Sequence, residues 1–170
     1  MLIIIYGNLG TGKSSLGKML SEKKGFELIQ FDKEMWKFKD KIYTKEDDFL
    51  LEKKEILKVY ENMHKLAKNM LKQSKTVILD SLYLKQQRED AKEIAKQTNN
   101  KWIIVEVSCD EKEIRKRLTK RKKEDVKTPG FKLYLEYKNL LEKEPNCIKI
   151  NTSSKNIEES YEELIKKIQK

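Results

Sequence analysis

The sequence contains few of the residues that characterise several large classes of protein. Its 170 residues include two cysteines, two prolines and six glycines. Two cysteines are too few for a disulfide framework, and so little proline and glycine excludes collagen-like and linker-like segments. The longest apolar runs are only as long as a strand, so we find neither a candidate membrane span nor a secretory signal. We therefore expect a cytoplasmic protein of one domain that does not enter a membrane.

Charge, in contrast, is abundant and unbalanced. The 38 Lys and Arg residues exceed the 28 Asp and Glu residues, which gives a formal net charge of +10. Such an excess favours polyanionic partners, either nucleotides or nucleic acid, through long-range attraction. Most of the cations are lysines interspersed with glutamates along helical patterns, which is also typical of an ordinary solvated surface. Nucleic acid is therefore a candidate partner that the charge alone does not decide.

The most specific pattern in the sequence lies close to its N-terminus. Residues 7–14 read GNLGTGKS and fit the motif Gly-x-x-x-x-Gly-Lys-Ser/Thr. The apolar run at 2–6 before it predicts a buried parallel strand, and the pattern at 15–20 after it predicts a helix. A strand, a glycine-rich loop and a helix in this order form a phosphate-binding loop.

The residue types of this loop suit a polyphosphate. Glycines at positions 10 and 12 let successive backbone N–H groups turn toward an anion, and the helix that follows directs its positive end at the same point. Lys13 supplies a mobile cation for the β- and γ-phosphates, and Ser14 offers a hydroxyl to Mg²⁺. We therefore predict a nucleotide and Mg²⁺ as cofactors. The nucleotide is predicted to be ATP and not GTP, because no guanine-reading motif follows the fourth predicted strand. The predicted nucleotide-binding residues of the loop are Gly10, Thr11, Gly12, Lys13, Ser14 and Ser15.

Strand and helix patterns alternate along the rest of the chain. Further apolar segments predict strands at 26–31, 76–80, 102–107 and 147–150. Because helical patterns separate these strands, we expect right-handed crossovers and a sheet covered on both faces. The prediction is a single α/β domain over 1–170, a three-layer α/β/α P-loop NTPase fold with a mainly parallel five-stranded sheet. The order of the strands does not follow from the pattern.

Two acids stand at the ends of predicted strands, where ligands bind in open parallel sheets. Asp80 ends the strand at 76–80, on the edge where P-loop enzymes hold Mg²⁺, usually through water. Asp32 could face a group that accepts a phosphate and take its proton. It could equally cap the helix that begins at residue 33, because Asp is a favoured residue at that position. The local sequence leaves these two alternatives open.

Arginine is scarce beside lysine, so its positions are informative. Arg117 and Arg121 are four residues apart and share one face of the helical pattern that begins at residue 111. Two guanidinium groups fit phosphate oxygens in a planar, forked geometry that lysine cannot reproduce. A solvated basic face or an RNA-contacting patch is the alternative.

The sequence also predicts a lid at 117–130 and the position of its single histidine, His64. Residues 117–130 are expected to form a short helical lid over the nucleotide, basic in character and broken by the turn signal Pro129-Gly130. His64 falls one position away from the apolar stripe of the helical pattern at 46–73. We therefore expect His64 at the surface or at its boundary, without a catalytic role.

Together these motifs resemble the small P-loop kinases of the AAA type. The branch to which they are most similar contains the kinase domain of bacteriophage polynucleotide kinase and related 5′-hydroxyl and small-molecule kinases. The resemblance covers nearly the whole chain, from Leu2 to the polar loop at Asn151. It rests on the motif at 7–14, on Phe31-Asp32, on Leu79-Asp80-Ser81 followed by Arg88, and on Arg117 and Arg121 in the pattern Arg-Leu-x-x-Arg.

This resemblance implies a kinase that moves the γ-phosphoryl group of ATP to a hydroxyl acceptor, either a polynucleotide 5′-hydroxyl or a small molecule. It implies that Lys13 holds the β- and γ-phosphates, that Ser14 binds Mg²⁺ and that Asp32 is the catalytic base. Arg121 would reach the phosphates from the lid. The predicted catalytic residues are therefore Lys13, Asp32 and Arg121.

The resemblance also implies roles for the remaining candidates. Arg117 would flank the adenine or support the lid, and Asn151 would lie near the adenine. Asp80 would lie near Mg²⁺ or the acceptor. Asp32, Asp80 and Arg88 are the predicted acceptor-binding residues.

Two alternative functions stay open. In a nucleoside monophosphate kinase, Arg88 and lysines of the segment 33–75 would bind the phosphate of the acceptor. In a nucleotide-gated RNA-binding or regulatory ATPase, the charge of +10 would matter more than phosphoryl transfer. In similar kinases the helical segment corresponding to 33–75 builds the acceptor site, but here it contains no motif for a particular substrate.

Overall fold

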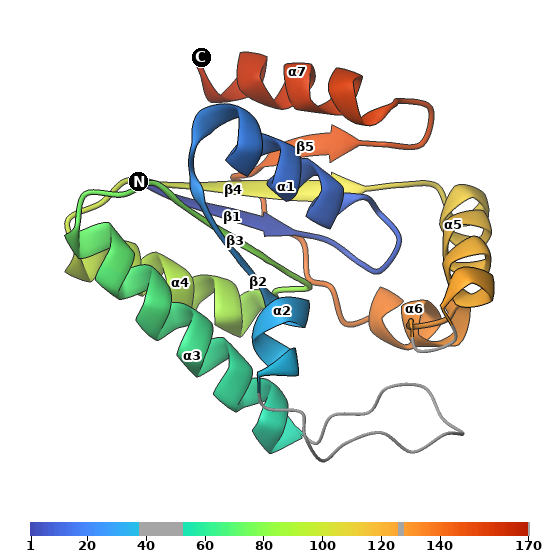
Figure 1. Cartoon of the computed structure of the whole chain (residues 1–170), viewed down its shortest axis with the longest axis horizontal. Coiled ribbons are helices and arrows are strands. Elements are labelled where there is room, and N and C mark those ends of the chain that lie inside the picture. The colour runs from blue at the N-terminus through green and yellow to red at the C-terminus, as the bar shows by residue number, and fades with distance from the viewer. Residues whose placement is uncertain (38–52, 126–127, 170) are drawn as a thin grey trace.

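A computed structural model describes residues 1–37, 53–125 and 128–169. Its centre is a sheet with the strand order β2-β3-β1-β4-β5, and every strand pairs in parallel with its neighbours (Figure 1). The strands are β1 (Leu2–Tyr6), β2 (Glu27–Gln30), β3 (Val77–Ser81), β4 (Trp102–Ser108) and β5 (Ile148–Asn151). The predicted α/β fold with a parallel five-stranded sheet is therefore confirmed.

Helices cover both faces of this sheet. They are α1 (Lys13–Lys24), α2 (Phe31–Trp36), α3 (Lys53–Lys72), α4 (Lys85–Gln97), α5 (Glu111–Glu124), α6 (Phe131–Lys138) and α7 (Ile157–Ile168). Figure 1 shows α1 and α7 on one face, α3 and α4 on the other, and α5 with α6 beyond the end of β4. None of these described helices is long and apolar enough to cross a membrane.

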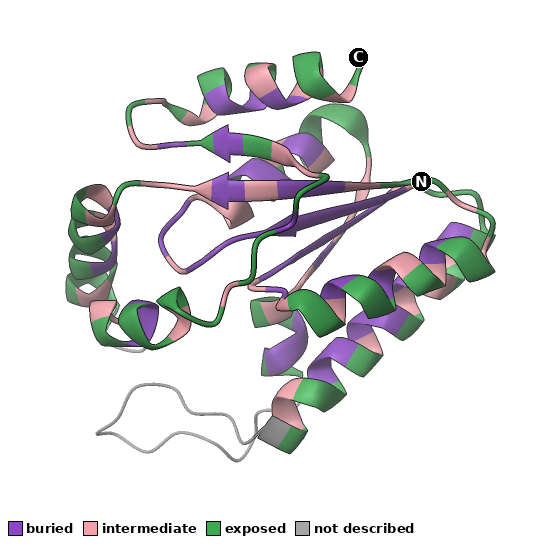
Figure 2. Ribbon diagram, turned by 180° about the vertical axis from the view of Figure 1, so that it is seen from behind, coloured by how far each residue is buried: buried purple, intermediate pink, exposed green. Residues whose placement is uncertain are grey.

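The central strand β1 is buried on both faces and divides the core into two parts. Ile3 packs with Leu16 of α1 and Leu164 of α7. Its neighbour Ile4 points the other way and packs with Met63 of α3. Figure 2 shows the buried residues on the strands and on the helix sides that face them. A strand covered on both faces needs a continuous apolar run, which explains the unbroken sequence at 2–6.

Two predicted regions lie partly outside the described residues. Within the segment 33–75, the structure describes the end of α2 and all of α3, which packs against α2 and α4. Within the predicted lid at 117–130, it describes the last turns of α5 and residues 128–130. An acceptor-binding role for the first region and a lid role for the second stay predictions.

The expected position of His64 is wrong. Its side chain is only 9% exposed, because α4 packs over that side of α3. His64 Nε2 lies 3.2 Å from Tyr83 Oη within hydrogen-bonding distance. Burial lowers the pKa of His64 from its ordinary 6.5 to about 4, although the nearby Asp90 carboxylate opposes this shift. The ring is therefore neutral in the folded protein at pH 7.

We expect this histidine to make the fold sensitive to mild acid. Between pH 6.5 and pH 4 the unfolded chain binds a proton at His64 and the folded chain does not, so stability falls as the pH falls. The loss reaches about 3 kcal/mol in the free energy of unfolding at the lower limit. Urea unfolding at pH 7 and at pH 4.5 measures it. The variant His64→Gln keeps a polar group beside Tyr83 but cannot titrate. Between pH 7 and pH 4.5 its free energy of unfolding should therefore fall by less than that of the unmodified protein, and the difference should be most of this loss of about 3 kcal/mol. An equal loss in both proteins would contradict the expectation.

Candidate active site

The loop between β1 and α1 brings backbone N–H groups to one point. Gly10 and Gly12 have φ values of 75° and 92°, in the region that favours glycine. Gly12 is also the N-cap of α1, and no side chain caps this helix. At Gly7 a Cβ atom would lie 2.2 Å from the carbonyl oxygen of Val107 on β4. The glycines therefore allow a tight turn that leaves the first N–H groups of α1 directed at an anion.

Side chains hold three carbonyl oxygens of this loop. Thr11 Oγ1 donates to the carbonyl of Asn8 at 2.8 Å. Arg117 Nη1 donates to the carbonyl of Gly10 at 3.3 Å. Thr152 Oγ1 donates to the carbonyl of Thr11 at 2.7 Å. Because these oxygens are bound by donors, they do not turn into the space that a phosphate would take.

Arg117 connects α5 to the loop and to the segment after β5. Its Nη2 donates to the carbonyl of Thr152 at 2.9 Å, and its Nε donates to Glu113 Oε1 at 3.0 Å. Both predicted roles of Arg117, flanking the adenine and supporting the lid, stay predictions. Arg121, one turn further along α5, is exposed and does not line the cavity described below. Its contact with phosphates stays a prediction.

Asp80 of β3 lies beside the loop and is 2% exposed. The parallel register places it opposite Ile5 on β1. Its Oδ2 accepts a hydrogen bond from Gln30 Nε2 at 2.8 Å, whereas its Oδ1 is buried without a partner among the described residues. Burial raises the pKa of Asp80, while the nearby Lys13 ammonium, Gln30 amide and Ser14 hydroxyl lower it.

The unpaired Asp80 Oδ1 and the Ser14 hydroxyl are the donors that fit the predicted Mg²⁺ ion. Both are hard oxygen ligands, the type that Mg²⁺ prefers. Within the described parts of the chain, no cluster of three or more His, Cys, Asp or Glu residues could hold a metal. A cation here would therefore keep water or phosphate oxygens as its other ligands, as Mg²⁺ commonly does.

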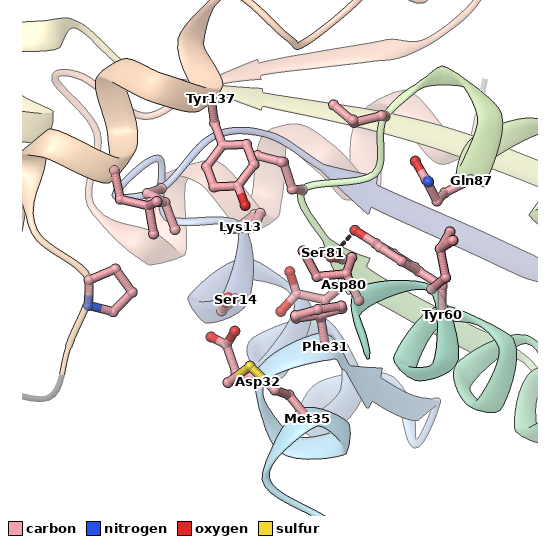
Figure 3. Close-up of a pocket in the computed structure, with 17 residues that line it drawn as sticks. Lys13, Ser14, Phe31, Asp32, Met35, Tyr60, Asp80, Ser81, Gln87 and Tyr137 are labelled. Atoms are coloured by element: carbon pink, nitrogen blue, oxygen red, sulfur yellow. Dashed lines mark hydrogen bonds between the residues drawn. The ribbon is translucent and has the colours of Figure 1, made fainter. Parts of the chain in front are cut away.

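Asp32 lies in the first turn of α2. The predicted strand at 26–31 is shorter than expected, since β2 ends at Gln30, and Gln30 is the N-cap of α2. The alternative that Asp32 caps this helix is therefore wrong. Figure 3 shows the Asp32 carboxylate pointing toward Ser14. It lines the same cavity as Ser14 and Asp80.

This cavity of about 240 Å³ opens from the phosphate loop toward α3. Its polar end is formed by Lys13, Ser14, Asp32 and Asp80. Most of the remaining wall is apolar and comes from α2, α3, α6 and the connection between β3 and α4 (Figure 3). This wall includes Phe31, Met35, Ile56, Tyr60, Leu84 and Leu133.

Four polar side chains of this wall are absent from the predicted site: those of Tyr60, Ser81, Gln87 and Tyr137. Tyr60 Oη and Ser81 Oγ form a hydrogen bond of 2.8 Å, drawn in Figure 3. Burial raises the pKa of Tyr60 to about 12, against the effect of the Ser81 hydrogen bond, so the phenol stays protonated at neutral pH. Gln87 Oε1 is buried without a partner among the described residues. Only Ser81, next to Asp80, had a signal in the sequence, because Tyr60 belongs to an apolar helical stripe and Gln87 to a charged helical pattern.

Arg88, a predicted acceptor-binding residue, does not line the cavity. Its side chain is fully buried, and its guanidinium lies 4.5 Å from the centre of the Tyr6 ring on β1. It donates to the carbonyls of Tyr83 and Glu142 at 2.7 and 3.0 Å. It also pairs with Glu144 Oε2 at 3.3 Å. All of these contacts are with the protein, so they support packing and leave the predicted acceptor contact without a structural basis.

Asn151 ends β5 and is exposed. Its Oδ1 accepts a hydrogen bond from Ser153 N at 2.9 Å, which shapes the turn after the strand. The neighbouring Thr152 is buried and is the residue that contacts the phosphate loop. This segment therefore lies beside the loop, while a contact between Asn151 and adenine stays a prediction.

Comparisons with known proteins agree with the fold. The model of the AAA domain family matches residues 2–136. No curated protein sequence matches the chain. Solved structures do match, and among them are several small kinases.

Three of these structures cover nearly the whole chain. A candidate kinase from Chloroflexus aurantiacus J-10-fl has a TM-score of 0.75 at 15% identity, over 97% of this chain and 96% of the other. A gluconokinase from Sinorhizobium meliloti 1021 has a TM-score of 0.69 at 18% identity, over 98% and 90%. The Mycobacterium tuberculosis APS kinase in complex with AMPPNP and APS has a TM-score of 0.71 at 13% identity, over 99% and 97%. At such identities the likeness shows a shared fold, and it does not confirm a polynucleotide-kinase branch in particular.

Proposed function

The chain belongs to the AAA domain family, and from that premise we propose that it is an ATP- and Mg²⁺-dependent kinase acting on a hydroxyl of a small molecule. One observation carries this proposal. Lys13 and Ser14 of the phosphate loop, the Asp80 carboxylate with its unpaired oxygen, and the Asp32 carboxylate all border one cavity. Phosphoryl transfer needs a phosphate cradle, a cation site and a proton acceptor within reach of each other.

Each of these residues has a proposed role. Lys13 and the loop N–H groups neutralise and orient the β- and γ-phosphates of ATP. Ser14 and Asp80 would hold Mg²⁺, Asp80 through water, and the bound ion would supply further neutralisation of phosphate charge. Asp32 accepts the proton of the attacking hydroxyl. Arg121 would add positive charge near the phosphates from α5.

The comparisons support a small molecule as the acceptor. The similar structures include a gluconokinase and an APS kinase, which act on small molecules by their names. A nucleoside monophosphate kinase would need a cation for the acceptor phosphate. Of its candidates, Arg88 is buried and bonded to the protein, and no described lysine of the segment 33–75 lines the cavity. An RNA-binding or regulatory ATPase is supported only by the net charge of +10.

The first test is nucleotide binding. We expect calorimetry to detect binding of the ATP analogue AMPPNP with Mg²⁺, and the variant Lys13→Ala to weaken it by at least about tenfold, because the phosphate charge loses its nearest cation. Lys18→Ala is the matched control, since Lys18 lies on the same helix with a side chain that is 67% exposed. Equal binding by the two variants would refute the proposal.

The second part of the test is transfer. Label from γ-labelled ATP is expected on one member of a panel of neutral alcohols, nucleosides, nucleoside monophosphates, sugar acids and 5′-hydroxyl oligonucleotides, and is expected to be lost in Lys13→Ala. Nucleotide binding without any transfer, together with RNA binding that falls steeply with salt, would instead favour the regulatory ATPase.

A further inference from the structure

We propose that the acceptor is an uncharged hydroxyl compound with an apolar, ring-sized body and a second hydrogen-bond donor. This inference rests on the function proposed above and specifies its substrate class. Three independent properties of the cavity point to it: the apolar wall, the charges that line it and an unpaired amide oxygen.

The first property is the wall next to the reaction centre. Phe31 and Tyr60 pack with ring centres 5.0 Å apart, and with Met35 and Ile56 they line the space beyond Asp32. Figure 3 shows Phe31, Met35 and Tyr60 next to the Asp32 and Asp80 carboxylates. A polyhydroxylated acceptor would leave several hydroxyls against these side chains without partners, which is unfavourable. An apolar body instead gains from leaving water.

The size of the cavity limits that body. Its volume of about 240 Å³ exceeds the roughly 150 Å³ of an engineered apolar cavity that binds benzene. A single ring with short substituents therefore fits the space. An extended chain of nucleotides would reach beyond it.

The second property is charge. Among the described residues that line the cavity, Lys13 is the only cation, whereas Asp32 and Asp80 are acids. Lys13 belongs to the phosphate loop and is occupied by the donor phosphates. The Mg²⁺ ion proposed at Ser14 and Asp80 would be shared with the same phosphates. An acceptor with a carboxylate or phosphate would therefore meet the Asp32 carboxylate and the donor phosphates, with no free cation in this lining, and such a like-charge contact is strongly unfavourable. An uncharged acceptor avoids this repulsion.

The third property is the amide of Gln87. Its Oε1 is buried and has no hydrogen-bond partner among the described residues, although the residue lines the cavity. A buried oxygen of this kind gains from a donor. A second hydroxyl or an N–H group on the acceptor would supply that donor and orient the reacting hydroxyl.

The transfer step then follows from the positions of these groups. The acceptor hydroxyl lies at the polar end of the cavity, where its proton passes to the Asp32 carboxylate. The hydroxyl oxygen forms a bond to the γ-phosphorus as the bond from that phosphorus to the β–γ bridging oxygen breaks. The products are a phosphate monoester and ADP, and Asp32 later releases its proton to water.

Two probes with the same phenyl ring test whether the acceptor must be uncharged. Phenylethane-1,2-diol is uncharged and mandelate carries a carboxylate, while both have a phenyl ring and a hydroxyl. Calorimetry on the full chain, with and without Mg²⁺ and AMPPNP, is expected to show tighter binding of the diol by at least about tenfold. With γ-labelled ATP, the diol should accept label, and gluconate, AMP and a 5′-hydroxyl oligonucleotide should not.

Two leucines provide a matched pair of variants. Leu57 of α3 lines the cavity and is 42% exposed, and Leu135 of α6 is 45% exposed and lies outside that lining. The variant Leu57→Lys places a cation at the cavity, so we expect it to narrow the preference for the diol over mandelate by at least about fivefold. Leu135→Lys should leave the preference unchanged, which separates a cavity effect from the added net charge.

The failure of this inference differs from the failure of the proposed kinase. Equal binding of the two probes, tighter binding of mandelate, or no binding of either would overturn the acceptor class, even if AMPPNP binds normally. If the unmodified protein does not bind AMPPNP, the proposed kinase function is refuted instead. The preference between the two probes is also measured without nucleotide. It therefore tests the acceptor class even if the protein does not bind AMPPNP.

Discussion

Replacing Asp32 by asparagine is expected to lower the turnover number for phosphoryl transfer by about 10²- to 10⁴-fold, the usual contribution of a positioned general base. Asparagine keeps the size and polarity of the side chain, so the cavity should keep its shape. Its amide, however, cannot accept the proton of the acceptor hydroxyl. The KM for ATP and the affinity for AMPPNP should change by less than about threefold, because the lost interaction belongs to the transition state.

Two other acids serve as controls for this prediction. Glu93→Gln removes an exposed acid of α4 that pairs with Lys96, and it should leave turnover unchanged. Asp80→Asn should mainly raise the Mg²⁺ concentration needed for activity, because Asp80 is proposed to hold the ion. A turnover number of Asp32→Asn within about tenfold of the unmodified protein would exclude Asp32 as the base.

The largest effect on stability is expected from Arg88→Met. The methionine fills much of the same space but leaves Glu144, whose side chain is 10% exposed, with Lys92 as its remaining ionic partner. It also removes the donors to the carbonyls of Tyr83 and Glu142. Breaking a buried ion pair in this way costs about 3–5 kcal/mol in the free energy of unfolding. Urea unfolding at pH 7 measures the loss.

Two further variants make this prediction specific. Arg115→Met removes an exposed arginine stacked 3.9 Å from the centre of the Phe131 ring, and it should cost no more than about 1 kcal/mol. The double variant Arg88→Met with Glu144→Met removes both charges and should recover much of the stability. If Arg88 instead bound the acceptor, its substitution would raise the KM for the acceptor and leave the free energy of unfolding nearly unchanged.

Local sequence patterns were sufficient to predict the strands of the sheet and the phosphate loop. The run at 2–6 is apolar without alternation, which only a strand covered on both faces requires, and β1 is the central strand. The motif at 7–14 can be recognised from its own glycines and the helix after it, and in the structure Gly10 and Gly12 adopt positive φ values. The residues that signal these features lie close together in sequence, although the strands themselves pair across long stretches of the chain.

Long-range packing decided the surroundings of the loop. Thr152 supports the carbonyl of Thr11 across 141 residues of sequence, and Asn8 Nδ2 donates to the carbonyl of Tyr134 at 3.0 Å. Neither threonine nor asparagine has a spacing that predicts such a contact. His64 was misplaced for the same reason, because the helix that buries it begins more than twenty residues later.

The sequence by itself determined that this chain is an α/β protein with a glycine-rich loop of the phosphate-binding type and an acid near the end of another strand. The physical reason is that backbone turns and strand burial depend largely on local residue types. Only the tertiary structure decided that Asp32 is not a helix cap, that Arg88 is a buried structural residue and that the cavity is largely apolar. Those properties depend on contacts between α2, α3, α4, α6 and the sheet, and these contacts join residues that are far apart in the sequence.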